Sequence, residues 1–282
     1  MLGLARYAMN GRRQATITVF VCGLIPLLNM IVPALLGLVL LRHGPREALL
    51  VTAWAALPLF GWAMMGDITP LLLLIGVLAL AVVLRQTTSW QFTLLAAILV
   101  GVGAEMALRL RPDFLVLLQQ QVEAFMAAGA VPDQPVIDAD VMRSALISLF
   151  GVMHMFMSIC LLMLARWWQA VLYNPGGFQQ EFHQIRLQPS VAMTLMVLFL
   201  AASVGVTVLT GWILYFMLPL FFAGLALVHG LVGLKKLSRL WLVAFYMLML
   251  NPPLAQLLSV AALIDSWYDF RSRVKTSGGP TS

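Results

Sequence analysis

Long stretches without a charged residue alternate with short polar stretches along this 282-residue chain. The uncharged stretches cover residues 14–41, 48–66, 68–84, 86–104, 144–165, 187–234 and 240–264. About 20 apolar residues form a helix that spans a bilayer, so the 48 residues of 187–234 are enough for two helices, with a break at Thr210–Gly211. The pattern predicts about eight apolar segments, all of them helical because an open strand edge cannot satisfy its hydrogen bonds in lipid.

The first apolar segment is interrupted by Pro26 and Pro33, with Asn29 between them. It is either one long kinked span or a short helix followed by a re-entrant arm. With eight full spans the Lys and Arg residues divide nine to eight between the two sides of the membrane, whereas a re-entrant first segment divides them eleven to six. The richer side then holds Arg6, Arg12, Arg13, Arg42, Arg46, Arg85, Arg166, Arg186, Lys235, Lys236 and Arg239. The positive-inside rule favours the second arrangement, which predicts a cytoplasmic N-terminus and a C-terminus on the opposite side.

A polar insertion, residues 109–143, separates two of the apolar segments. Asp113 suits the first turn of a helix. Apolar residues follow on one helical face, at Phe114, Leu117, Leu118, Val122, Phe125 and Met126. Gly129 predicts the end of this helix, and the remainder of the insertion is an acidic loop. We expect an amphipathic helix on the membrane surface, and packing of the same helix on the ends of other spans is an equal alternative.

A second insertion, residues 166–190, is rich in aromatic and turn-forming residues. Trp167, Trp168 and Tyr173 suit the interfacial belt of a membrane protein, and the stretch from Asn174 to Gly177 predicts a turn. A belt followed by a turn is the simplest role. The alternative is a lid over a cavity or a partner-docking loop made by Trp167, Trp168, Asn174 and Phe178.

Composition agrees with a membrane location. Hydrophobic residues make up 62% of the chain and charged residues 10%, against about 45–50% and about 25% in soluble domains. We therefore expect an all-α, polytopic membrane protein with one integral membrane domain, residues 1–282, that ends in a disordered tail, residues 272–282. The net charge of +6 comes from basic residues spread between the apolar segments. This spacing favours contact with an anionic membrane surface over nucleic acid.

Polar side chains within the apolar segments are the candidate functional groups, because they are costly in lipid. Asn29, Glu105, His154 and His229 form the candidate polar pocket. Glu105 precedes Arg109 by one helical turn, which favours an ion pair over a proton-coupling carboxylate. His154 lies among methionines that suit a soft metal, but adjacent residues point to different faces of a helix, so a hydrogen bond to another helix is favoured.

Several catalytic motifs are absent from the sequence. There is no phosphate-binding Gly-x-x-x-x-Gly-Lys-Ser/Thr loop, no His-Glu-x-x-His, no Cys-x-x-Cys and no Gly-x-Ser-x-Gly, which are the signatures of ATPases, zinc proteases, redox proteins and serine hydrolases. We therefore expect a protein that is not an enzyme and that needs no cofactor or metal.

The C-terminal third carries a family resemblance. Residues 222–229, Phe-Ala-Gly-Leu-Ala-Leu-Val-His, and residues 264–271, Ile-Asp-Ser-Trp-Tyr-Asp-Phe-Arg, resemble elements of the YybS-like predicted membrane protein family. Residues 33–47 also look like that family, and the stretch from Trp167 to Phe178 looks like a feature of its proteobacterial members. The family has no assigned activity. It is remotely similar to the substrate-binding membrane subunits of energy-coupling-factor transporters.

Two functions follow as expectations. The resemblance and the proline-broken helices favour a small-solute-binding or transport-like protein of the bacterial inner membrane, working with a membrane-protein partner or an energising subunit. The alternative is a non-catalytic membrane scaffold that recruits partner proteins. Asp265 and Asp269 are expected to pair with neighbouring arginines at the end of the last span.

Overall fold

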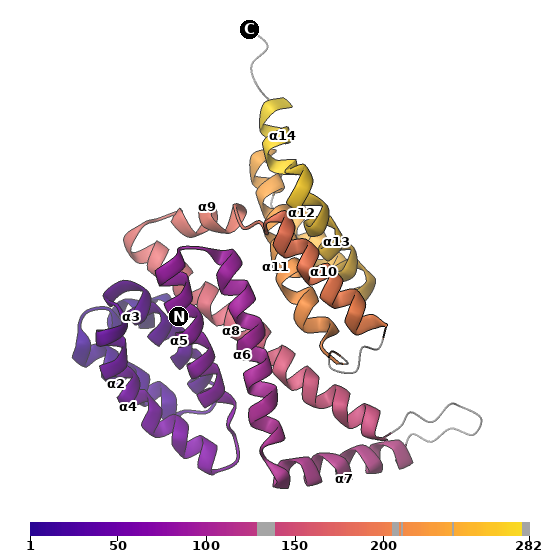
Figure 1. The fold of residues 1–282 in the computed structure, drawn as a ribbon. Helices are drawn as coiled ribbons and strands as arrows, with labels where there is room; N and C mark the ends of the chain where they lie inside the picture. Colours follow the sequence, from indigo (N-terminus) through magenta and orange to yellow (C-terminus); the bar gives the residue numbers. More distant parts are fainter. Residues whose placement is uncertain (129–138, 205–208, 210, 239, 278–282) are drawn as a thin grey trace.

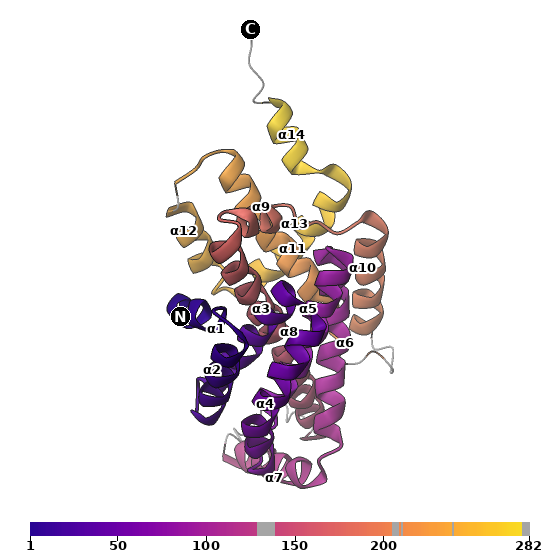
Figure 2. The same ribbon diagram turned by 90° about the vertical axis from the view of Figure 1, so that its left-hand side faces the viewer.

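The computed structural model describes residues 1–128, 139–204, 209, 211–238 and 240–277. It is 86% helical, with no strand among the described residues, and the chain is an all-α polytopic membrane protein. Helix α7 (Pro112–Ala128) lies at one end of the molecule and helix α9 (Gly177–His183) toward the other, where the C-terminal helix extends beyond it, in both views (Figure 1; Figure 2). We call these the α7 end and the α9 end.

Among the described residues, five helices are long and apolar enough to span a membrane. They are α4 (Pro45–Met64), α5 (Thr69–Thr87), α6 (Trp90–Arg109), α8 (Ala139–Tyr173) and α11 (Ile213–Leu234). A shorter apolar helix, α10 (Pro189–Ser203), precedes α11. The predicted break between these two helices is confirmed by Gly211, whose φ is 90°, while Thr210 lies outside the described residues. The count is lower than eight because the first and last apolar segments are each broken and α10 is shorter than a span.

The first segment forms a hairpin of α2 (Arg12–Leu24) and α3 (Val32–His43), joined through a short 3₁₀ turn, Asn29–Ile31. Arg12 at the start of α2 forms an ion pair with Glu47 at the start of α4, at 2.6 Å. At their other ends, the indole Nε1 of Trp62 donates to the carbonyl of Gly23 at 2.9 Å. Helices α2 and α4 are therefore parallel, α3 runs back between their ends, and the re-entrant arrangement predicted for this segment is correct.

Local sequence explains both the hairpin and its depth in the core. Pro26 cannot donate a hydrogen bond to continue α2, and Leu27 takes a left-handed φ of 69°. Pro33 then falls in the first turn of α3, where its missing N–H is not needed. Every residue from Val32 to Leu41 is buried, so α3 is the central helix of the molecule.

The last apolar segment also turns back. Helices α12 (Leu240–Leu248) and α13 (Pro252–Tyr268) meet at an angle of 116°. Helix α12 follows Leu237 at the α9 end, and α13 returns there, because Arg186 donates to the Asp265 carbonyl at 3.0 Å. This geometry does not fit the prediction that the termini lie on opposite sides, because the last segment begins and ends at the α9 end.

Two predicted polar regions are helical where the structure describes them. Helix α7 is confirmed, with Val122 buried and with Val116 and Leu117 exposed. Its predicted stop, Gly129, and the loop through residue 138 lie outside the described residues. Residues 139–143, expected in that loop, begin α8. The predicted tail is also helical through Ser277, in α14 (Phe270–Ser277), and residues 278–282 lie outside the described chain.

The charges are divided very unequally between the two ends. Three basic side chains that the structure describes lie at the α7 end: Arg109, Arg111 and Arg143. Twelve lie at the α9 end: Arg6, Arg12, Arg13, Arg42, Arg46, Arg85, Arg166, Arg186, Lys235, Lys236, Arg271 and Arg273. The hairpin of α12 and α13 thus increases the difference in basic residues between the two ends, because it returns Arg271 and Arg273 to the α9 end.

Candidate functional site

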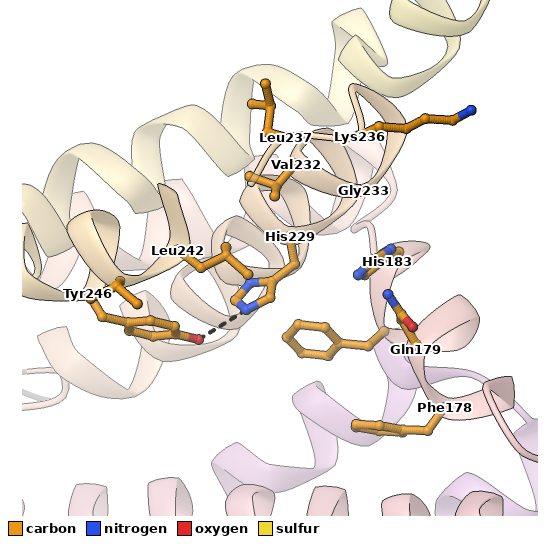
Figure 3. A pocket seen from close by; sticks show the side chains of 12 residues that line it. Phe178, Gln179, His183, His229, Val232, Gly233, Lys236, Leu237, Leu242 and Tyr246 are labelled. Atoms are coloured by element: carbon orange, nitrogen blue, oxygen red, sulfur yellow. Dashed lines mark hydrogen bonds between the residues drawn. The ribbon is translucent and has the colours of Figure 1, made fainter. Parts of the chain in front are cut away.

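A pocket of about 700 Å³ lies at the α9 end, between α9, α11 and α12 (Figure 3). We call it the α9 pocket. Its wall combines aromatic and polar side chains: Phe178, Gln179 and His183 from α9, His229 from α11, and Tyr246 from α12. The pocket thus brings Phe178, predicted for a docking loop, together with His229, predicted for a polar pocket.

His229 is held in one orientation by hydrogen bonds at both ring nitrogens. Its Nδ1 lies 2.8 Å from the carbonyl of Leu225, one turn earlier in α11. Its Nε2 lies 3.2 Å from the hydroxyl of Tyr246. A neutral ring satisfies both contacts when Nδ1–H donates to the carbonyl and Nε2 accepts from the hydroxyl. His229 therefore joins α11 to α12 across the pocket.

His183, at the end of α9, makes no hydrogen bond to the described residues. Burial, together with the nearby His229 and Arg271, lowers the pKa of His183. Its ring lies beside Gly233, where a Cβ atom would approach the His183 Cε1 to 2.9 Å. In Figure 3 the side chains of His183, Gln179 and His229 face a common space.

A second, more polar pocket of about 330 Å³ adjoins the first. Gln179, His183 and Gly233 line both pockets. Gln180, Gln184, Gly230, Leu234 and Arg271 complete the second one. The two pockets therefore form one site with two compartments, and His183 stands where they meet.

Arginine–aspartate contacts hold α14 and α13 against the chain that follows α9. Arg271 pairs with Asp265 at 3.3 Å and donates to the Ile185 carbonyl at 3.0 Å. Arg186 pairs with Asp269 at 2.8 Å. The predicted pairing of the two aspartates with arginines is confirmed. Burial lowers the pKa of the Arg271 guanidinium, partly offset by Asp265, and its buried Nε has no hydrogen-bond partner in the part of the chain that the structure describes.

The aromatic loop before α9 is only partly available to a partner. Trp167 is 42% exposed and Asn174 is exposed, but Trp168 is fully buried. Phe178 packs edge-on against Trp90, with ring centroids 6.3 Å apart. The assignment of Trp168 to the interfacial belt or to a docking surface is wrong, because its ring is a core side chain.

Glu105 belongs to a packed cluster rather than to a pocket. Its Oε1 accepts from Arg109 at 2.7 Å, which confirms the predicted ion pair, and its Oε2 accepts from the Tyr215 hydroxyl at 2.9 Å. Gly151 lets α8 approach this cluster, since a Cβ there would lie 1.8 Å from the Tyr215 oxygen. The contact with Tyr215 was not predicted, because this residue lies 110 positions away from Glu105 in the chain.

The remaining candidates are also separate from the α9 pocket. His154 is buried, and its Nδ1 contacts the Phe150 carbonyl of its own helix at 2.8 Å, not another helix as predicted. Asn29 is buried in the turn of the first hairpin. Neither residue, nor Glu105, lines either compartment. The four residues predicted to form one polar pocket therefore do not form a single site.

Three further residues that line the α9 pocket were not predicted: Gln179, His183 and Tyr246. The available signal was the spacing of Phe178, Phe182 and His183, which gives the short helix α9 one face that lines the pocket. No family model, curated protein or solved structure matches the chain. The family resemblance therefore stays a prediction.

Proposed function

We propose that this membrane protein binds a small solute in the α9 pocket, in a transport-like role with a membrane-protein partner. The supporting observation is the convergence of polar and aromatic side chains from α9, α11 and α12 on one pocket of about 700 Å³. Binding sites of this size are concave, mostly apolar and equipped with a few polar groups that orient the ligand. The wall formed by α12 belongs to a broken segment, a recurring feature of transporter binding sites.

We further propose that the α9 end faces the cytoplasm of a bacterial inner membrane. Twelve basic side chains at the α9 end against three at the α7 end fit the positive-inside rule. A cytoplasmic pocket is accessible to a soluble or membrane-bound energising subunit. The scaffold alternative has less support, because Trp168, one of its docking residues, is buried.

The test is to identify what the protein carries when it is purified in native lipid nanodiscs. Mass spectrometry of the extracted small molecules should show a compound that is enriched with the natural sequence and lost with Gly233→Leu, because that side chain would extend beside His183. Gly103→Leu is the matched control, since no atom lies within 4 Å of a Cβ at that exposed position. Equal recovery from all three proteins, or no enriched compound, would contradict the proposal.

A further inference from the structure

The two compartments of the site differ in chemistry, and this difference specifies a ligand. The larger compartment is lined mainly by aromatic and aliphatic side chains, among them Phe178, Phe182 and Leu242. The smaller one includes the amide, imidazole and guanidinium groups of Gln179, Gln180, Gln184, His183 and Arg271. A ligand that fills both must have an apolar body and a polar head that meet near His183.

The polar compartment is built for an acceptor. Neither compartment has a carboxylate among its described lining residues. Arg271 is 9% exposed, and its Nε is buried with no partner among the described residues. A Cβ at Gly230 would lie 3.1 Å from that Nε, so the glycine leaves the Arg271 side chain room to shift toward a ligand. An unmatched buried donor is costly, and a charged oxygen is the partner that satisfies it best.

The aromatic compartment is positioned for a ligand that comes from the bilayer. No residue of its α12 wall is buried. Leu240, Trp241, Met247 and Leu248 on that helix are each at least 60% exposed. In a membrane these side chains contact lipid, so α12 is the wall that separates the larger compartment from the lipid acyl chains. The basic residues around this end would also concentrate anionic amphiphiles near the opening.

We infer that the solute is an amphiphilic anion, with a phosphate- or carboxylate-type head in the polar compartment and an apolar chain between Phe178 and α12. This inference rests on the proposed function and specifies its ligand class. Head and chain are both required, because each compartment satisfies only one of them.

Titration calorimetry on the full chain in phosphatidylcholine nanodiscs tests this, with the signal of empty nanodiscs subtracted. The probes are dodecyl phosphate, inorganic phosphate and dodecyltrimethylammonium. We expect dodecyl phosphate to bind about tenfold or more tightly than either of the others. Against the ammonium probe, this is the ratio expected when one charge-assisted hydrogen bond is lost, and against inorganic phosphate it comes from the burial of the apolar chain. Equal binding of inorganic phosphate would overturn the need for a chain, and equal binding of the ammonium probe would overturn the anionic head.

Two variants locate the binding. Gly230→Ala should weaken dodecyl phosphate binding about fivefold or more by crowding the Arg271 side chain, and Phe178→Ala should weaken it by removing a contact with the apolar chain. Gly103→Ala and Phe92→Ala, both at exposed positions of α6, should leave it unchanged. If Gly230→Ala proves unstable, Gln179→Leu replaces it, because this exposed side chain makes no hydrogen bond to the described residues. Unchanged binding in all the pocket variants would refute the assignment of this site.

The two proposals fail in different ways. If a compound is lost from Gly233→Leu but dodecyl phosphate does not bind, the solute-binding function stands and the anionic class is wrong. If no compound is enriched and no probe binds, both are wrong.

Discussion

Removing the Tyr215 hydroxyl should destabilise the protein by a measurable and specific amount. Tyr215 is fully buried, and its hydroxyl donates to Oε2 of Glu105 at 2.9 Å. Arg109 donates through Nε and Nη2 to the other oxygen, Oε1, at 3.1 and 2.7 Å. Tyr215→Phe keeps the ring but leaves one oxygen of a carboxylate that is 1% exposed without this donor.

The expected loss is about 1.5–3 kcal/mol in the free energy of unfolding, the range for a hydrogen bond to a charged group. It should exceed the ~0.6 kcal/mol that is average for hydrogen bonds between membrane helices, because the acceptor here is ionised and enclosed. The assay is reversible unfolding by sodium dodecyl sulfate in mixed micelles, followed by circular dichroism. Tyr173→Phe is the control, since Tyr173 is 41% exposed and its ring would remain under Arg42.

A double-variant cycle separates the hydroxyl's contact with Glu105 from its other contacts. In a Glu105→Gln background the acceptor is neutral, so the same Tyr215→Phe change should cost only about 0.5–1.5 kcal/mol. A loss below ~0.6 kcal/mol in the natural background, or an equal loss in both backgrounds, would refute the idea that this buried carboxylate depends on the hydroxyl.

Three further predictions concern topology, pH and packing. Reporter fusions at both termini should be cytoplasmic while a fusion within residues 109–143 is not; a C-terminal fusion on the opposite side would show that α12 and α13 cross the membrane. Because the folded protein lowers the pKa of His183 below its ordinary 6.5, the unfolded chain takes up a proton first as the pH falls. The His183 contribution to stability is thus full above about pH 6.5 and decreases below it, and His183→Gln should flatten that part of a stability-against-pH curve; an unchanged slope would contradict the shift. Trp168→Ala should cost about 3–5 kcal/mol of unfolding free energy, as for other buried aromatic residues, and Trp167→Ala much less; similar losses would place the two rings in similar environments.

Much of the fold follows from short-range patterns in the sequence. The helical segments come from uncharged runs, and the pairs Glu105–Arg109 and Asp265–Arg271 join residues no more than six apart in the chain. Helix geometry fixes the first pair, which joins i and i+4 within α6, whereas the second joins α13 to α14 across the left-handed residue Asp269. The first hairpin was also predictable, because Pro26 and Pro33 break the helix and the division of basic residues favours a return to the same side.

The long-range part was not predictable in the same way. Counting charges treats the last segment as one span, since 25 uncharged residues are long enough to cross. Asn251 and the two prolines after it signal a break, but a break alone does not distinguish a kinked span from a hairpin. The pocket depends on contacts such as His183 with Gly233 and His229 with Tyr246, which join separate helices. The predicted polar pocket grouped residues by their polarity alone. In the fold, His154 contacts a carbonyl of its own helix and Glu105 pairs with Arg109, one turn away.

The hairpin of α2 and α3 and the hairpin of α12 and α13 share one topology but differ in burial. Both enter and leave at the α9 end, and both turn at a proline. In the first, ten consecutive residues of α3 are buried among α2, α4, α5 and α8, so any movement would open the core at high cost. In the second, α12 has no buried residue, and a hydrogen bond from Tyr246 to His229 is one of its few side-chain attachments to α11. Displacing α12 would therefore disturb little apolar packing, although α12 forms one wall of the α9 pocket. The asymmetry in burial, rather than the topology, distinguishes α12 from α3.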